Sequence, residues 1–171
     1  MSHICSSRLV KSGKCDHLLT PRPSLDRALD LSMEVARQIA ALPVRRGTQG
    51  SLLVLLVTSR ESGRWVIPKG WPWPDREEWA SAAEEAREEA GILGKADQKS
   101  IGSFRYHKRQ PIGTLLVDVT VYRFEVTEQL ATWPECEERQ RSWFSLTEAA
   151  AVVAEPELQE LIRRLASEAT A

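Results

Sequence analysis

The chain has 171 residues, of which 42% are hydrophobic and 27% are charged, and its formal net charge at pH 7 is −1. This length suits a single domain with its own core. The nearly neutral balance argues against a nucleic-acid or membrane partner, and no apolar run reaches the ~18 residues of a membrane helix. We therefore expect a cytoplasmic protein; the composition does not predict its oligomeric state.

The N-terminal segment carries Ser, Lys, Gly and Pro with little periodicity. Residues 1–23 are therefore predicted to form a flexible arm, and residues 24–171 the domain. Ser24 can cap a helix over 24–36. The segment 38–45 is predicted to be a strand at a sheet edge, because Pro43 has no N–H to donate to a neighbouring strand.

The apolar run over 51–58 predicts a strand that is buried on both faces, which implies helices on both sides of the sheet. A short strand follows at 64–67. Two prolines and a glycine make 69–75 a loop. The remaining elements are predicted at 77–90 (helix), 100–107, 114–126 and 141–144 (strands), and 146–154 and 156–169 (helices).

The segment 77–90 is the clearest helix, because it is rich in Ala, Glu and Arg and contains neither Gly nor Pro. Gly91 is placed to end it in a left-handed conformation. Small side chains at Ala82, Ala86 and Ala90 form a stripe, which allows this helix to pack closely against a sheet.

Three carboxylates share one face of that helix, because Glu85, Glu88 and Glu89 stand at i, i+3 and i+4. Such close like charges repel each other unless a divalent cation lies among them. Hard cations such as Mg²⁺ prefer carboxylate oxygens, and they orient phosphate chains and acidify bound water. The run is also compatible with a solvated helix face. The Pro-Lys-Gly loop before it and the alanine stripe behind it favour the metal site.

The stretch 70–92 resembles the Nudix signature, G-x5-E-x7-R-E-U-x-E-E-x-G-U, where U is aliphatic. The positions match without a gap at Gly70, Glu85, Glu88, Glu89, Gly91 and Ile92. The resemblance implies an α/β (α+β) fold, in which a mixed sheet lies between helices as an α/β/α sandwich. It also implies Mg²⁺ or Mn²⁺ as cofactor, catalytic roles for Glu85, Glu88 and Glu89, and a metal site formed by these glutamates with Gly70.

The chain departs from the signature at two positions. Arg76 stands where the signature has its first glutamate, and Glu84 stands where it has arginine. That arginine orients and neutralises the glutamates in the family, so Glu84 adds negative charge where positive charge is expected. Arg87 can pair with Glu84 from three residues away, and Glu84→Arg is expected to tighten metal binding.

Segments outside the signature look like the diphosphoinositol polyphosphate phosphohydrolase branch of this family. They are 53–60, 64–68, 101–104 and 139–144, and the Lys-Gly-Trp-Pro loop at 69–72 looks like a bacterial subgroup of that branch. The resemblance spans about residues 39–165. It implies an inositol or nucleoside polyphosphate as substrate, and dinucleoside polyphosphates fit as well.

A substrate with several phosphates needs cations outside the metal cluster. The candidates are Arg64, Lys69, Arg105, His107, Lys108 and Arg109. Arg64 matches the family pattern and is the strongest of them. Arg105, His107 and Arg109 alternate along one extended segment and are expected to share a face. Each of these residues is equally compatible with a solvated loop rim.

For two further groups of side chains the sequence leaves more than one role open. Trp71 and Trp73 either stack on a base or pack against their own domain, and at least one is expected to do the latter. A late-loop glutamate assists as base in many Nudix enzymes, and the sequence does not choose among Glu135, Glu137 and Glu138.

These observations favour a pyrophosphohydrolase that uses metal-activated water to cleave a phosphoanhydride bond in a phosphorylated small molecule. The alternative is a Nudix-fold module that binds a nucleotide or phosphorylated ligand without turnover. Glu84 and Arg76 favour the alternative, and the retained glutamates favour the enzyme.

Overall fold

The computed structural model describes residues 35–168 of the chain. Its strands are β1 (Ala36–Arg46), β2 (Leu52–Thr58), β3 (Trp65–Val66), β4 (Lys69–Gly70), β5 (Ile92–Ala96), β6 (Gly102–Arg109), β7 (Thr114–Gln129) and β8 (Arg141–Ser145). Its helices are α1 (Glu78–Ala90), α2 (Leu146–Val152) and α3 (Pro156–Glu168), with a 3₁₀ turn at Thr48–Gly50. The predicted arm at 1–23 lies outside the described residues.

The strands form one mixed sheet in the order β3-β2-β1-β7-β5. The strands β1 and β7 run parallel, from Ala36 opposite Val117 to Val44 opposite Glu125, and the other pairs are antiparallel. The strand β4 joins β1, β6 joins β7, and β8 joins β2. The predicted mixed sheet is thus confirmed.

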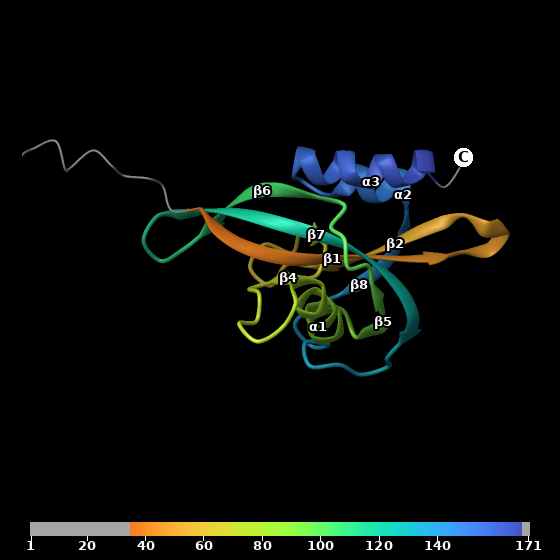
Figure 1. The fold of residues 1–171 in the computed structure, drawn as a ribbon, viewed down its shortest axis with the longest axis horizontal. Coiled ribbons are helices and arrows are strands. Elements are labelled where there is room, and N and C mark those ends of the chain that lie inside the picture. Colours follow the sequence, from red (N-terminus) through yellow and green to blue (C-terminus); the bar gives the residue numbers. More distant parts are fainter. Residues whose placement is uncertain (1–34, 169–171) are drawn as a thin grey trace, which may run out of the picture. The chain divides into compact units, whose positions relative to one another are not determined.

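Helices cover both faces of the sheet, as Figure 1 shows, with α1 on one face and α2 and α3 on the other. The alternation of side chains along β1 divides it between two cores. Ile39 and Ala41 pack with the alanines of α1, while Ala40 and Leu42 pack with α2 and α3. The α/β/α sandwich is therefore confirmed.

The strand β1 lies inside the sheet, so its predicted edge position is wrong. It is flanked by β7 on one side and by β2 and β4 on the other. The ladder between β1 and β2 spans positions 44–46, opposite Val54, Leu53 and Leu52, and ends before Pro43. Pro43 is tolerated because its missing N–H falls at the end of that ladder.

The helix predicted over 24–36 lies almost wholly outside the described residues, and Ala36 is already in β1. The short strands β4 and β5 were not predicted, because two to five residues carry too little periodicity. The C-terminal segment forms two helices, the short α2 and the longer α3, and Pro156 begins α3 as expected. No helix within 35–168 has the length and hydropathy needed to cross a bilayer.

Candidate active site

The helix α1 is held against the sheet by its small side chains. Ala82, Ala86 and Ala90 have no exposed surface and pack between β1 and β5. Gly91 ends the helix in the left-handed region, with φ 60° and ψ 42°, as predicted. This packing leaves Glu85 and Glu89 facing the loop that precedes the helix.

Gly70 and Glu85 meet directly. Gly70 pairs with Ile39 in the sheet, and this strand position lies against α1. A Cβ atom at position 70 would overlap the Glu85 carboxylate. Glycine is therefore required here for a close approach, and the loop and helix halves of the signature converge at this point.

Glu89 is the most buried of the three glutamates, at 7% exposure. One of its oxygens accepts a hydrogen bond from the backbone N–H of Lys69 at 3.0 Å. Its other oxygen is paired with the guanidinium of Arg139. Burial raises the pKa of Glu89, while Arg139 and Lys69 act to lower it.

Arg139 is a central cation of the site. Its side chain is 5% exposed, and it bridges Glu89 and Glu135 while donating to the carbonyl of Thr58 at 2.9 Å. It thus supplies positive charge to the glutamates, a role that the signature gives to the position held by Glu84. Arg139 was not predicted, although it lies in the 139–144 segment that resembles the branch.

Glu85 has a strongly perturbed pKa. Burial raises the pKa of its carboxyl to about 7, and repulsion from Glu89 and Glu88 adds to the effect. The Glu85 side chain is therefore divided between its neutral and charged forms near neutral pH. A divalent cation beside Glu85 would favour the charged form.

Glu88 lies apart from the other two. It is 37% exposed and pairs with Arg87 at 3.3 Å, and it does not line the cavity that contains Glu85 and Glu89. Among residues 35–168 no three His, Cys, Asp or Glu side chains converge tightly enough to enclose a metal ion. The donors still suit Mg²⁺, since this ion keeps several waters and needs only one or two protein carboxylates.

A cavity of about 730 Å³ opens over Glu85 and Glu89. Of the predicted cations, Arg64, Lys69, His107, Lys108 and Arg109 line it. Arg105 does not, because it pairs with Asp118 on the neighbouring strand at 3.6 Å. Arg105, His107 and Arg109 alternate along β6 on its more exposed face, as expected, and a substrate-binding role for Arg105 stays a prediction. A separate cavity of about 860 Å³, beside Trp79 and α3, contains none of the α1 glutamates.

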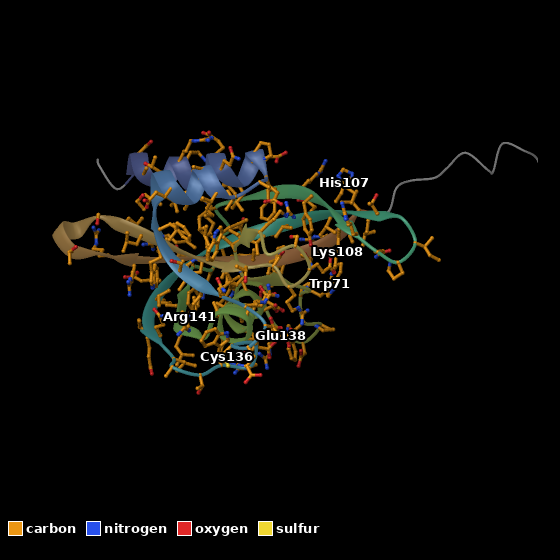
Figure 2. All side chains as sticks on the ribbon, turned by 180° about the vertical axis from the view of Figure 1, so that it is seen from behind. Trp71, His107, Lys108, Cys136, Glu138 and Arg141 are labelled. Carbon is orange, nitrogen blue, oxygen red and sulfur yellow. The ribbon has the colours of Figure 1, made fainter. Side chains whose placement is uncertain are left out.

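The loop between β7 and β8 distinguishes the three late glutamates. Glu135 lines the cavity and pairs with Arg139. Glu138 points to the exposed Arg60 at 3.3 Å, and Glu137 is exposed. Figure 2 shows this loop, with Glu138 and Cys136 labelled, below the β6 residues His107 and Lys108. Glu135, Glu137 and Glu138 stand close together in the sequence, so only the folded structure shows which of them enters the cavity.

The two loop tryptophans have different surroundings. Trp71 lines the cavity, and the ammonium of Lys108 lies 5.2 Å from its ring centroid. Trp73 lies under the guanidinium of Arg76 at 4.7 Å, and its backbone N–H donates to Ser81. The prediction that at least one packs against its own domain is confirmed by Trp73.

A match to a protein-family model shows which family the chain belongs to. A model described as the NUDIX domain matches residues 36–165. The chain belongs to the Nudix family. The match contains every strand of the sheet and both halves of the signature, so the family assignment covers the fold and the candidate site together.

Curated Nudix proteins of known name are similar to this chain. The chloroplastic Nudix hydrolase 21 from Arabidopsis thaliana is 35% identical over 101 residues, which is 58% of this chain and 50% of that protein. Diphosphoinositol polyphosphate phosphohydrolase 2 from Rattus norvegicus is 31% identical over 134 residues, covering 77% and 70%. The chain spans about half to two thirds of the first relatives it matches.

Solved structures share the Nudix fold with this chain. A binary complex of the Ap4A hydrolase from C. elegans superposes with a TM-score of 0.58 at 20% identity, covering 78% of this chain and 96% of that one. At this identity the similarity shows the fold alone.

Proposed function

We propose that this Nudix protein is a metal-dependent pyrophosphohydrolase, which cleaves a phosphoanhydride bond in a nucleoside or inositol polyphosphate. One observation carries the proposal. A single cavity contains two glutamates of the signature helix, the glycine beneath one of them, and a wall of basic side chains. Family membership and the named hydrolases among its relatives support the same activity.

The residues that would hold Mg²⁺ or Mn²⁺ are Glu85 and Glu89, with the backbone of Gly70 beside them, and Glu88 would join them only after turning away from Arg87. When bound, such a cation neutralises phosphate charge and makes a coordinated water more acidic. Glu135 lines the same cavity and is linked to Glu89 through Arg139, and it would take the proton of the attacking water. It is the late-loop glutamate that we assign as base.

The reaction forms a bond from the water oxygen to one phosphorus and breaks the bridging P–O bond to the next phosphate. The proton passes to the Glu135 carboxylate, and the leaving phosphate departs with the bridging oxygen. Lys69 and Arg64 would stabilise the charge that develops on phosphate oxygens, while Arg139 holds Glu89 and Glu135 in position. Arginine suits this role because its fork gives two parallel hydrogen bonds.

The branch and the cellular compartment are part of the proposal. The relatives named diphosphoinositol polyphosphate phosphohydrolases support that branch, and the Lys-Gly-Trp-Pro loop supports the bacterial subgroup predicted from the sequence. A cytoplasmic location and a phosphorylated small-molecule partner follow the same prediction.

Two contacts favour a second candidate, a module that binds its ligand without turnover. Both oxygens of Glu89 are already engaged, by Arg139 and by the Lys69 backbone. Glu88 is turned toward Arg87. A cation would have to share Glu89 with Arg139, and a site that retained Arg139 in place would bind ligand and leave it intact.

Phosphate release separates the two candidates. The full chain is titrated with Mg²⁺ and with Mn²⁺ on a panel of polyphosphate substrates, and metal binding is measured by calorimetry. The proposal expects metal-dependent release that Glu89→Gln abolishes without unfolding the chain. Glu160→Gln, on the exposed face of α3, is the matched control and should turn over normally. Ligand binding without release would support the second candidate.

A further inference from the structure

Three cations of the cavity, all of them arginines, already neutralise protein carboxylates. Arg64 pairs with the buried Glu155 at 3.6 Å. Arg60 pairs with Glu135 at 3.5 Å, and Arg139 pairs with both Glu89 and Glu135. These guanidiniums are therefore held in place, but their charge is not fully available to a substrate.

The cavity wall also carries much negative charge. Its carboxylates are Glu61, Glu85, Glu89, Glu135 and Glu155. Within residues 35–168, the lining cations Lys69, Lys108 and Arg109 make no ion pair with a described residue. Such a balance suits a substrate with few phosphates in one chain. It suits an inositol ring that carries phosphate on every side less well, because phosphates turned toward the lining carboxylates would be repelled by like charge.

An aromatic surface lies beside those unpaired cations. Trp71 comes from the loop that links β4 to α1, and it is 45% exposed at the mouth of the cavity. Lys108 reaches it from β6, and Figure 2 shows the two side chains side by side. A half-exposed indole is a stacking platform for any planar base, and an ammonium next to it is a phosphate ligand.

The contact between Lys108 and Trp71 is weak and exchangeable. A cation over an aromatic ring in a solvent-exposed setting gains less than a charge-assisted hydrogen bond to phosphate. A substrate phosphate can therefore draw Lys108 away from the indole, and this movement frees the ring face for a base. Binding of the phosphate and binding of the base are then coupled through one pair of side chains.

We propose that Trp71 and Lys108 form a selectivity element, which makes this site specific for a diphosphate that carries a nucleoside. The base stacks on Trp71, and Lys108 moves onto the phosphate nearest the nucleoside. Trp71 acts on substrate choice and not on bond cleavage. This inference rests on the proposed hydrolase function, and it selects the nucleoside class over the inositol class.

The test compares two substrates in the full chain with metal present. One is diadenosine tetraphosphate, which carries a base, and the other is an inositol pyrophosphate, which carries none. Trp71→Ala should raise KM about tenfold or more for the first, with kcat little changed, and should leave KM for the second within about twofold. Trp71→Phe should recover most of the loss, because it restores an aromatic face.

Two further variants make the test specific. Trp73→Ala removes an equally large side chain from the same loop, at 39% exposure and outside the cavity wall, and should leave the ratio of the two KM values unchanged. Lys108→Met should weaken both substrates. Its effect should be non-additive with Trp71→Ala only for the substrate with a base.

Each outcome decides the proposal. Equal losses on both substrates in Trp71→Ala would overturn it, as would wild-type chain that prefers the inositol substrate. If neither substrate is hydrolysed, the hydrolase function fails separately, and calorimetry with ADP then tests the stacking alone. An ADP affinity that is the same in wild type and Trp71→Ala would overturn the inference in that case.

Discussion

Arg76 and Glu84 form an ion pair, with the guanidinium Nη1 of Arg76 3.8 Å from Oε2 of Glu84. These are the two positions where the chain departs from the Nudix signature, and their charges are exchanged relative to it. The pair links the loop after Gly70 to α1, and Arg76 also lies over Trp73. The two departures therefore compensate each other across the loop–helix junction.

Exchanging the charges at positions 76 and 84 tests how much their ion pair contributes to the free energy of unfolding. Glu84→Arg alone would leave the new cation between Arg76 and Arg87, and it should lower the free energy of unfolding by about 1 kcal/mol. The double variant Arg76→Glu with Glu84→Arg should recover only the part that belongs to the pair of positions 76 and 84, because Arg87 still faces a cation. Urea unfolding of the four proteins measures the coupling, and additive effects would show that the pair contributes nothing. The gain in metal affinity predicted for Glu84→Arg is a separate expectation, and a Mn²⁺ titration of the same variant measures it.

Arg139 should be the most important single cation for stability in this site. Its removal in Arg139→Ala leaves Glu89 and Glu135 buried without their counter-charge, a loss of roughly 3–5 kcal/mol. The matched control is Arg60→Ala, because Arg60 pairs with the same Glu135 but is 56% exposed; its cost should stay below about 1 kcal/mol. Chemical denaturation compares the two, and equal costs would contradict the assigned role of burial.

Gly70→Ala should weaken metal binding more than it weakens the fold. The new methyl group meets the far end of the Glu85 side chain, which can swing away while the backbone keeps its position. We expect metal affinity to drop roughly tenfold, or ~1.4 kcal/mol, in a Mn²⁺ titration by calorimetry. Gly63→Ala is the control, since Gly63 has φ 65° and open space around it. It should reduce stability and leave metal affinity unchanged.

The raised pKa of Glu85 predicts how stability varies with pH in the absence of metal. Its pKa is about 7 in the folded chain, against an ordinary value of 4.5. The folded state thus binds the proton more tightly, so this group stabilises the fold below 4.5 and loses that contribution as the pH rises through 7. In chelator-containing buffer, the stability of wild type relative to Glu85→Gln should fall over that interval. A difference that stays constant or rises with pH would refute the assignment.

The same titration should affect metal uptake. Because a proton and a cation compete for the Glu85 carboxylate, Mn²⁺ affinity is expected to rise as the pH increases from about 6 to 8. Binding should also release protons, which calorimetry detects as a dependence of the measured heat on the ionisation enthalpy of the buffer. Identical heats in two such buffers near pH 7 would contradict this expectation.

Local patterns in the sequence determined α1, its glycine end, the buried strand β2 and the set of glutamates on one helix flank. These features depend on residues within about two helical turns of each other, or on burial on both faces of a strand, and both leave a regular spacing in the chain. The family resemblance then predicted the mixed sheet between helices.

The tertiary structure alone decided which side chains meet. Arg139 contacts Glu89 across 50 residues, Glu135 enters the cavity while Glu138 faces Arg60, and Arg105 turns to Asp118. No spacing in the sequence predicts such contacts, because they depend on how β7 and β8 join the sheet and how α1 packs on it. Strand β1 shows the same limit, since its place inside the sheet depends on partners that are distant in the sequence.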